Sequence, residues 1–277
     1  MSDMRPHSKH WWEKVAGAPR KKPSDLGLSP PSFYGITETG RRERNEDAIL
    51  VLPLIDACLL AVADGLGGHA AGDYASDLAI RVLKDGVIST YHPGMTIPDI
   101  EDMLRALYDT AHHSIRNEGV GRREGMGATL VSALIRGDEA VIANTGDSRA
   151  YLVGKSVDRI TKDHSIVQSL VDEGLITEEQ AGRHPMRNIL SSSLGGASFQ
   201  IDLYHVSLMG GRPTLLLCSD GLSGFAGEEE MLAAAARPSA EDAVRWLVEL
   251  ALEHGSNDNV SVVMYRGRPE QPGEREV

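Results

Sequence analysis

The sequence of 277 residues is poor in cysteine and has no long apolar run. Its two cysteines, Cys58 and Cys218, lie in separate apolar stretches and form no C-x-x-C pair, which favours buried, reduced thiols over a disulfide or a zinc site. No stretch approaches the roughly 18 apolar residues of a membrane span, and the N-terminal segment lacks the apolar core of a secretory signal. We therefore expect a cytoplasmic protein that binds no membrane.

Positive charge is also scarce, because 28 Lys and Arg face 40 Asp and Glu and leave a net charge of −12. This balance argues against a nucleic-acid partner, since phosphate backbones require clustered basic residues. The six basic residues of positions 1–24 face only Asp3 and Glu13. We predict a flexible basic extension over residues 1–31 and a disordered tail over residues 268–277.

Short apolar strands recur between Phe33 and Arg266, and helical periodicity is confined to residues 75–83, 98–117 and 240–253. Residues 128–145 have the pattern of a hairpin that turns at Gly137-Asp138, and the next strand, SRAYLVG, is expected to extend it as a meander. The polar stretch 163–196 is typical of an inserted flap. Strands joined by short loops, with helices between groups of strands, predict an α+β fold with helices outside antiparallel sheets.

Carboxylates recur where apolar runs meet turns. They are Glu46 and Asp47 in RNEDAIL, Asp64 in VADGLGG, Asp220 in LCSDGLS and Asp258 in SNDNVSV. Taken singly, each is explained by the good turn-forming character of Asp-Gly and Asp-Asn. Together they predict a cation site, because buried carboxylates repel one another unless cations neutralise them. Oxygen ligands without a cysteine or paired-histidine set indicate Mg²⁺ or Mn²⁺, and two such ions can activate a bridging water for attack on phosphorus.

Eight segments in order resemble the motifs of metal-dependent protein phosphatases of type 2C, bacterial branch. They are RRERNEDA, ADGLGGH, GMGATL, NTGDSRAYL, ITKDHS, HPMRNILSSSLG, LCSDGL and SNDNVSVVM. The resemblance implies that residues 32–267 are a catalytic domain built as a four-layer α-β-β-α sandwich, with two central antiparallel sheets flanked by helices. It also implies hydrolysis of phosphoserine and phosphothreonine in proteins by a water that bridges two Mn²⁺ or Mg²⁺ ions.

The resemblance assigns roles to individual residues. Its metal ligands are Glu46, the bridging Asp64, the carbonyl of Gly65, Asp220 and Asp258, with Asp47 beside them. Arg42 matches the phosphate-binding arginine, although Arg41 and Arg44 are close enough in sequence to compete for this role.

Two departures from the family pattern affect the expected chemistry. Asp147 matches a ligand of a third metal ion, but Gly224 replaces the aspartate that usually completes that site, which argues against a third ion. Leu66 stands where animal relatives have a histidine, so leaving-group protonation is expected from metal-bound water. His69, His112, His113 and His164 are interpreted as structural.

The sequence is also compatible with two other functions. GLGGHA fits a dinucleotide-binding loop, with Asp85 twenty residues downstream. A phosphoprotein-binding module that has kept the fold and lost catalysis is the other alternative. For an active phosphatase the expected partners are phosphorylated proteins and a cognate Ser/Thr kinase, and the expected oligomeric state is a monomer.

Overall fold

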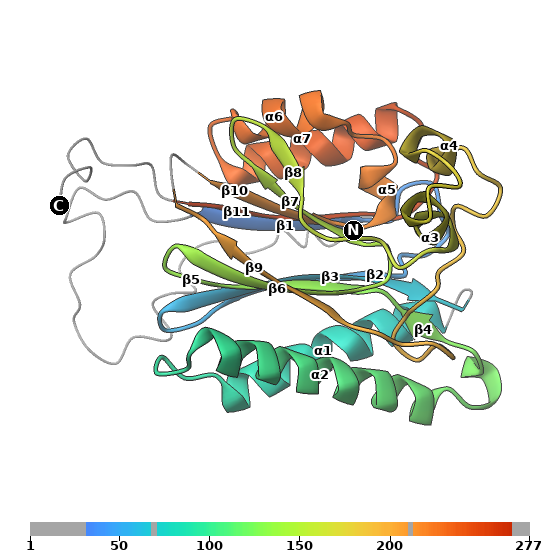
Figure 1. Ribbon diagram of the computed structural model, residues 1–277, viewed down its shortest axis with the longest axis horizontal. Coiled ribbons are helices and arrows are strands. Elements are labelled where there is room, and N and C mark those ends of the chain that lie inside the picture. Colours follow the sequence, from blue (N-terminus) through green and yellow to red (C-terminus); the bar gives the residue numbers. More distant parts are fainter. Residues whose placement is uncertain (1–31, 68–70, 210–212, 268–277) are drawn as a thin grey trace, which may run out of the picture. The chain divides into compact units, whose positions relative to one another are not determined.

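The computed structural model describes residues 32–67, 71–209 and 213–267. The described residues all belong to one compact unit, residues 31–277. Two antiparallel sheets stack face to face in this unit, and helices cover the outer face of each (Figure 1). The predicted four-layer arrangement is therefore confirmed. The predicted extension at 1–31 and tail at 268–277 lie outside the described residues.

The six-stranded sheet contains two of the aspartates predicted for the metal site, Asp47 and Asp64. Its order is β2 (Asp47–Pro53), β3 (Ala57–Leu66), β5 (Leu130–Arg136), β6 (Glu139–Thr145) and β9 (Asp202–Ser207), with the short β4 (Gly127–Ala128) paired to the end of β3. Helices α1 (Gly72–Thr90) and α2 (Ile97–Glu118) cover its outer face (Figure 1). Helix α2 begins at a capping box of Thr96 and Asp99 with Pro98 in its first turn, as helix-start chemistry requires.

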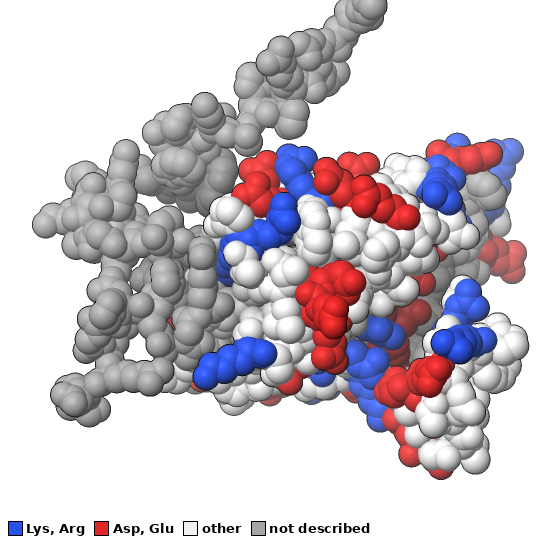
Figure 2. All heavy atoms as spheres, turned by 90° about the horizontal axis from the view of Figure 1, so that it is seen from above, with Lys and Arg blue, Asp and Glu red and all other residues white. Residues whose placement is uncertain are grey.

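The other two aspartates predicted for the metal site, Asp220 and Asp258, lie next to strand ends of the five-stranded sheet. Its order is β1 (Ser32–Glu38), β11 (Val260–Arg266), β10 (Thr214–Cys218), β7 (Arg149–Val153) and β8 (Val157–Arg159). Its outer face is covered by α6 (Glu228–Ala235) and α7 (Ala240–Glu253), while the single turn α5 (Asp220–Ser223) directly follows β10 (Figure 1). Acidic and basic side chains are interspersed over the face that α6 and α7 form (Figure 2).

Apolar side chains separate each pair of layers. One cluster joins α1 and α2 to the six-stranded sheet, one joins α6 and α7 to the five-stranded sheet, and a third fills the space between the sheets. Tyr108 of α2 is fully buried in the first cluster, and its hydroxyl donates to the Ala143 carbonyl oxygen at 2.8 Å and contacts the Ser132 hydroxyl at 2.9 Å. The polar tip of this ring is therefore satisfied within the core.

The expected meander after β6 is wrong. Strand β7 lies in the other sheet, where it pairs with β10 and β8, and the free edge of β6 pairs instead with β9. The chain crosses between the sheets in the turn that contains Asp147. Short strand spacing predicts antiparallel neighbours locally, but it does not reveal a change of sheet when both sheets present apolar edges.

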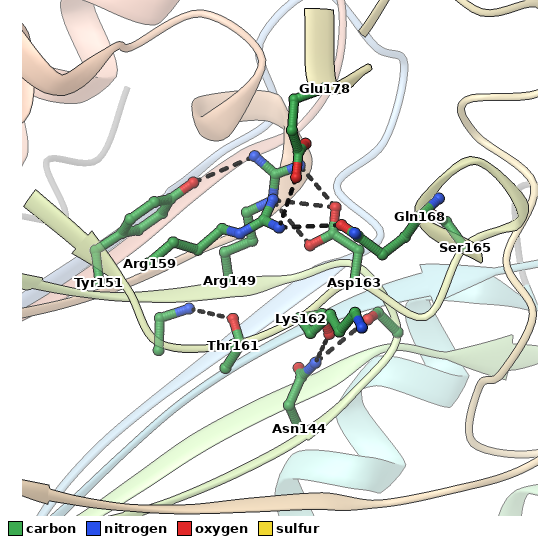
Figure 3. Close-up of polar contacts among 12 residues, drawn as sticks. Asn144, Arg149, Tyr151, Arg159, Thr161, Lys162, Asp163, Ser165, Gln168 and Glu178 are labelled. Carbon is green, nitrogen blue, oxygen red and sulfur yellow. Dashed lines mark hydrogen bonds and ion pairs between the residues drawn. The ribbon is translucent and has the colours of Figure 1, made fainter. Parts of the chain in front are cut away.

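The flap, residues 163–196, contains α3 (Ile166–Asp172) and α4 (Glu178–Gly182). Its first residue, Asp163, is ion-paired with Arg149 of β7 at 2.6 Å, and the Arg149 side chain is only 26% exposed. Arg159 of β8 reaches both flap helices, donating to Gln168 at 3.0 Å and pairing with Glu178 at 3.5 Å (Figure 3). The flap therefore rests on the β7–β8 edge through charge-assisted contacts.

A short 3₁₀ turn, η3 (Gly121–Arg123), joins α2 to β4. No helix of the described part of the chain combines the length and the apolarity needed to cross a bilayer.

Candidate metal centre

The acidic turns meet at one end of the two sheets. Asp47 and Asp64 are direct partners in the register of β2 and β3. Asp220 follows β10 and Asp258 precedes β11, the strand that pairs with β10. A cleft of about 500 Å³ opens here and is lined by Glu46, Asp64, Gly65, Asp147, Asp220 and Asp258, together with residues 41–44 and Asn188 and Leu190 of the flap. The fold thus brings together residues from six separate parts of the sequence.

Glycines allow this convergence because side chains would obstruct it. A Cβ atom at Gly221 would lie 1.9 Å from the Asn259 carbonyl oxygen, so only glycine lets the turn after Asp220 approach the turn at Asp258. A Cβ atom at Gly72 would lie 2.4 Å from a carboxylate oxygen of Glu46. The Glu46 carboxylate therefore sits against the N-terminus of α1, where the helix dipole favours negative charge.

Asn259 holds the segment that carries Glu46. Its side-chain amide donates to the carbonyl oxygens of Thr39 and Arg44, both at 2.9 Å, and its side-chain oxygen accepts from the Glu46 N–H at 2.9 Å. One buried side chain thereby fixes both ends of the loop 39–46. The sequence reading did not single out Asn259, and no local pattern identifies a contact made 213 positions away in the chain.

Hydroxyl groups hold two of the aspartates. The Ser219 hydroxyl donates to the Asp47 carboxylate at 2.8 Å, and the Thr129 hydroxyl accepts from the Asp64 N–H at 3.0 Å. Thr129 also contacts the Ser148 hydroxyl at 2.7 Å. Ser219 and Thr129 are almost fully buried, so these bonds fix the strand ends without solvent competition. Sequence reasoning missed both residues.

Burial and mutual repulsion perturb the carboxyl groups. Burial raises the pKa of Asp64 well above its ordinary value, and the neighbouring carboxylates, Asp47 first, add to this. Burial likewise raises the pKa of Asp47 to about 7, against the hydrogen bonds from Ser261 and Ser219, which lower it. The pKa of Asp147 rises to about 8 through burial and the charge of Asp220.

Burial, and after it the charge of Asp258, likewise raises the pKa of the Asp220 carboxyl group. Solvent still reaches Asp64, Asp147 and Asp220 through the cleft, although protein surrounds most of each side chain. Ionised carboxylates at such positions require nearby positive charge.

Arg42 is one source of that charge. Its guanidinium donates to the Asp258 carboxylate at 2.7 Å and to the Asn257 carbonyl oxygen at 3.1 Å, and the Arg42 side chain is 54% exposed at the cleft. This pairing turns Asp258 toward Arg42. No three His, Cys, Asp or Glu side chains in the described ranges converge closely enough to hold an ion as they stand.

The donors nevertheless suit hard divalent cations. They are all oxygens, from carboxylates and a backbone carbonyl, which Mg²⁺ and Mn²⁺ prefer. One oxygen of Asp220 is buried without a hydrogen-bond partner among the described residues, and such an orphaned anionic acceptor fits a cation ligand.

Asp147 lines the same cleft. Gly224 caps the C-terminal end of α5, and its N–H donates to the Asp220 carbonyl oxygen at 3.0 Å. It has no side chain to offer a third ion.

The histidines of the described ranges lie outside the cleft. His112 accepts from the Gly195 N–H at 3.1 Å and stacks on Phe199, and His164 accepts from the Gly146 N–H at 3.2 Å. These contacts agree with structural roles. His69 lies outside the described residues. Leu66, which stands where animal relatives have a histidine, lines the cleft.

Known proteins resemble this chain over most of its length. Residues 35–257 match the family model for protein phosphatase 2C. The chain belongs to the protein phosphatase 2C family. It is 39% identical to the serine/threonine phosphatase stp of Listeria monocytogenes over 236 residues, which cover 82% of this chain and 92% of stp.

The chain is also 39% identical to the serine/threonine protein phosphatase PstP of Mycobacterium tuberculosis over 226 residues, covering 80% of this chain. It spans only 42% of the length of PstP. The crystal structure of the PstP catalytic domain in complex with two manganese ions superimposes with a TM-score of 0.72 at 33% identity, covering 87% of this chain and 99% of that one.

As a member of this family the chain has the predicted fold, and the predicted enzyme class, a phosphoprotein phosphatase, is confirmed. The dinucleotide-binding alternative is wrong. Strand β3, which leads into GLGGHA, pairs antiparallel with β2 and β5, whereas a dinucleotide site needs a parallel βαβ unit.

Proposed function

We propose that this chain hydrolyses phosphoserine and phosphothreonine esters of proteins with the help of two Mn²⁺ or Mg²⁺ ions. The observation that carries the proposal is the gathering of Glu46, Asp64, Asp220 and Asp258 in one cleft beside an exposed arginine. Repelling carboxylates at this density suit cation binding far better than fold stability, because together they destabilise the metal-free protein.

Glu46, Asp64, Asp220, Asp258 and the Gly65 carbonyl would hold the ions. Asp47, fixed by Ser219 next to Asp64 in the sheet, keeps the strand end in place. When bound, the ions polarise phosphoryl oxygens and lower the pKa of water enough for attack near neutral pH. Asp147 contributes negative charge to the same cleft, and a third ion is not part of the proposal because position 224 is glycine.

Arg42 would position the phosphate. Its guanidinium lies at the cleft with fixed fork geometry, which suits two phosphoryl oxygens at once and aligns the ester for in-line displacement. The cleft-lining residues of the described ranges include no histidine, lysine or cysteine. Water is therefore the proton donor that we assign to the leaving alkoxide.

A catalytically silent phosphoprotein-binding module is the competing function, and the complete carboxylate set argues against it. A binding module would need Arg42 but not four repelling acids. The proposed partners are phosphorylated proteins and the Ser/Thr kinase whose work the chain reverses, and we propose that it acts as a monomer.

The test is release of phosphate from p-nitrophenyl phosphate and from a phosphothreonine peptide. We expect activity with Mn²⁺, its loss in excess chelator, its return on adding Mn²⁺, and a fall of at least about 100-fold in Asp64→Asn. Asp85→Asn is the matched control, because Asp85 is exposed on α1 and does not line the cleft. Activity that survives excess chelator, or an Asp64→Asn protein as active as the control, would contradict the proposal.

A further inference from the structure

Four consecutive charged residues, Arg41, Arg42, Glu43 and Arg44, line one part of the cleft, and all four are exposed. No other continuous segment of the described chain contributes as many charged side chains to this cleft. The two flap residues that line it, Asn188 and Leu190, are uncharged. Residues 41–44 are thus the exposed charged residues that line the cleft, and they form its rim.

The loop that bears these residues is rigidly placed. Asn259 donates to the carbonyl oxygens of Thr39 and Arg44 and accepts from the Glu46 N–H, and the Arg42 N–H donates to the Thr39 carbonyl oxygen at 3.3 Å. The backbone of the loop is thus held on both sides of Arg41. Side chains on such a support lose little further backbone freedom when a ligand binds.

The three arginines differ in their contacts. Arg42 is engaged with Asn257 and Asp258 inside the site. The Arg44 side chain is 57% exposed, and its ion-pair partner, Asp73, is 3.9 Å away, a contact of little strength in solvent. Within the described ranges Arg41 has no hydrogen-bond or ion-pair partner. Among the described residues, the Arg41 guanidinium thus has no partner and the Arg44 guanidinium has only the long ion pair with Asp73, so both can contact a ligand.

The local charge opposes that of the whole chain. With Arg42 assigned to the substrate phosphate, the exposed rim keeps Arg41 and Arg44 against Glu43, a net charge of +1. The chain as a whole carries −12, so it repels acidic peptides at long range. Among the residues that line the cleft, Arg41, Arg42 and Arg44 are the ones that can attract an acidic substrate.

We propose that Arg41 and Arg44 select phosphorylated sites flanked by anionic groups, which are either carboxylates or a second phosphate. The inference rests on the proposed phosphatase function and adds the substrate class. The guanidinium groups would contact the residues beside the phosphorylated one, while Arg42 holds the phosphate that is removed. Because these contacts are exposed, the preference should be modest and weakened by salt.

The experiment compares three phosphothreonine peptides that differ only in their flanks, which carry Glu, Gln or a second phosphothreonine. The readout is kcat/KM for each anionic peptide divided by kcat/KM for the Gln peptide, so that loss of general activity cancels. We expect a ratio of about three to ten for the unaltered protein, as two exposed ion pairs supply. The ratio should fall toward one in 0.5 M salt.

In the double variant Arg41→Gln/Arg44→Gln the ratio should fall to about one, and in Arg41→Lys/Arg44→Lys it should largely recover. Arg105→Gln, exposed on α2 and outside the cleft, should keep the ratio of the unaltered protein. The two anionic peptides tell which group is preferred, and a preference for either one supports the inference.

A ratio near one in the unaltered protein, or a ratio that the double variant keeps, overturns the inference while leaving the phosphatase function standing. If the unaltered protein hydrolyses neither these peptides nor p-nitrophenyl phosphate, the proposed function fails and the inference fails with it.

Discussion

Replacing Asp47 by asparagine should stabilise the metal-free protein at pH 8. Asp47 is only 8% exposed, and burial raises the pKa of its carboxyl group from 3.8 to about 7. Each tenfold change in proton affinity corresponds to about 1.4 kcal/mol, so the ionised carboxylate costs the native state up to about 4 kcal/mol. Asparagine has the same shape and can still accept the Ser219 hydrogen bond, but it carries no charge.

The sign of the pH dependence follows from the raised pKa. A carboxyl that binds protons more tightly in the native state contributes stability that is complete below pH 3.8 and is lost as pH rises through 7. The advantage of Asp47→Asn should therefore be largest at pH 8 and less than half as large at pH 5.

Urea unfolding followed by circular dichroism, in excess chelator at both pH values, measures this difference. Asp85→Asn on the exposed face of α1 is the control and should stay within about 0.5 kcal/mol of the unaltered protein. Saturating Mn²⁺ should remove the advantage, because bound cations stabilise the ionised carboxylates. An Asp47→Asn protein that is less stable than the unaltered one at pH 8 in chelator, or equally stabilised at both pH values, would refute this reasoning.

Two further substitutions test the supports of the site, and a third tests the core beneath it. Gly221→Ala should destabilise the fold by more than about 2 kcal/mol and abolish activity, since the added methyl group would lie 1.9 Å from the Asn259 carbonyl oxygen. The control is Gly154→Ala, where an added methyl group has no neighbour within 4 Å, and this variant should unfold in urea like the unaltered protein. Asn259→Ala removes three hydrogen bonds of the loop 39–46 and should cost about 2–3 kcal/mol in thermal unfolding together with most of the turnover; unchanged turnover would show that the loop needs no such support. Tyr108→Phe, in the helix–sheet core, should cost about 1–3 kcal/mol in urea unfolding without changing kcat of the folded enzyme, and a changed kcat would contradict its purely structural role.

Local patterns predicted the elements that build the scaffold. The periodicity over residues 240–253 corresponds to α7, and the hairpin at Gly137-Asp138 joins β5 and β6 as expected. Helix α6 and strand β8 were missed. Helix α6 has only eight residues and strand β8 only three, and segments this short have too few apolar positions to establish a period.

Contacts between distant segments lay beyond sequence reasoning. The change of sheet at β7 depends on which strand edges remain free after β6 has paired with β5 and β9. The role of Asn259 likewise depends on β1, β2 and β11 meeting in space. The aspartates could be proposed from sequence because each repeats the same local pattern, an acid at a turn that borders an apolar run. The ion pair between Arg42 and Asp258 gives no such local signal.

Anomalous diffraction from crystals grown with Mn²⁺ tests the central claim most directly. Two manganese peaks are expected in the cleft, within coordination distance of Glu46, Asp64, the Gly65 carbonyl, Asp220 and Asp258. A well-ordered cleft that holds no manganese peak at saturating Mn²⁺, with these carboxylates turned away from one another, would contradict it.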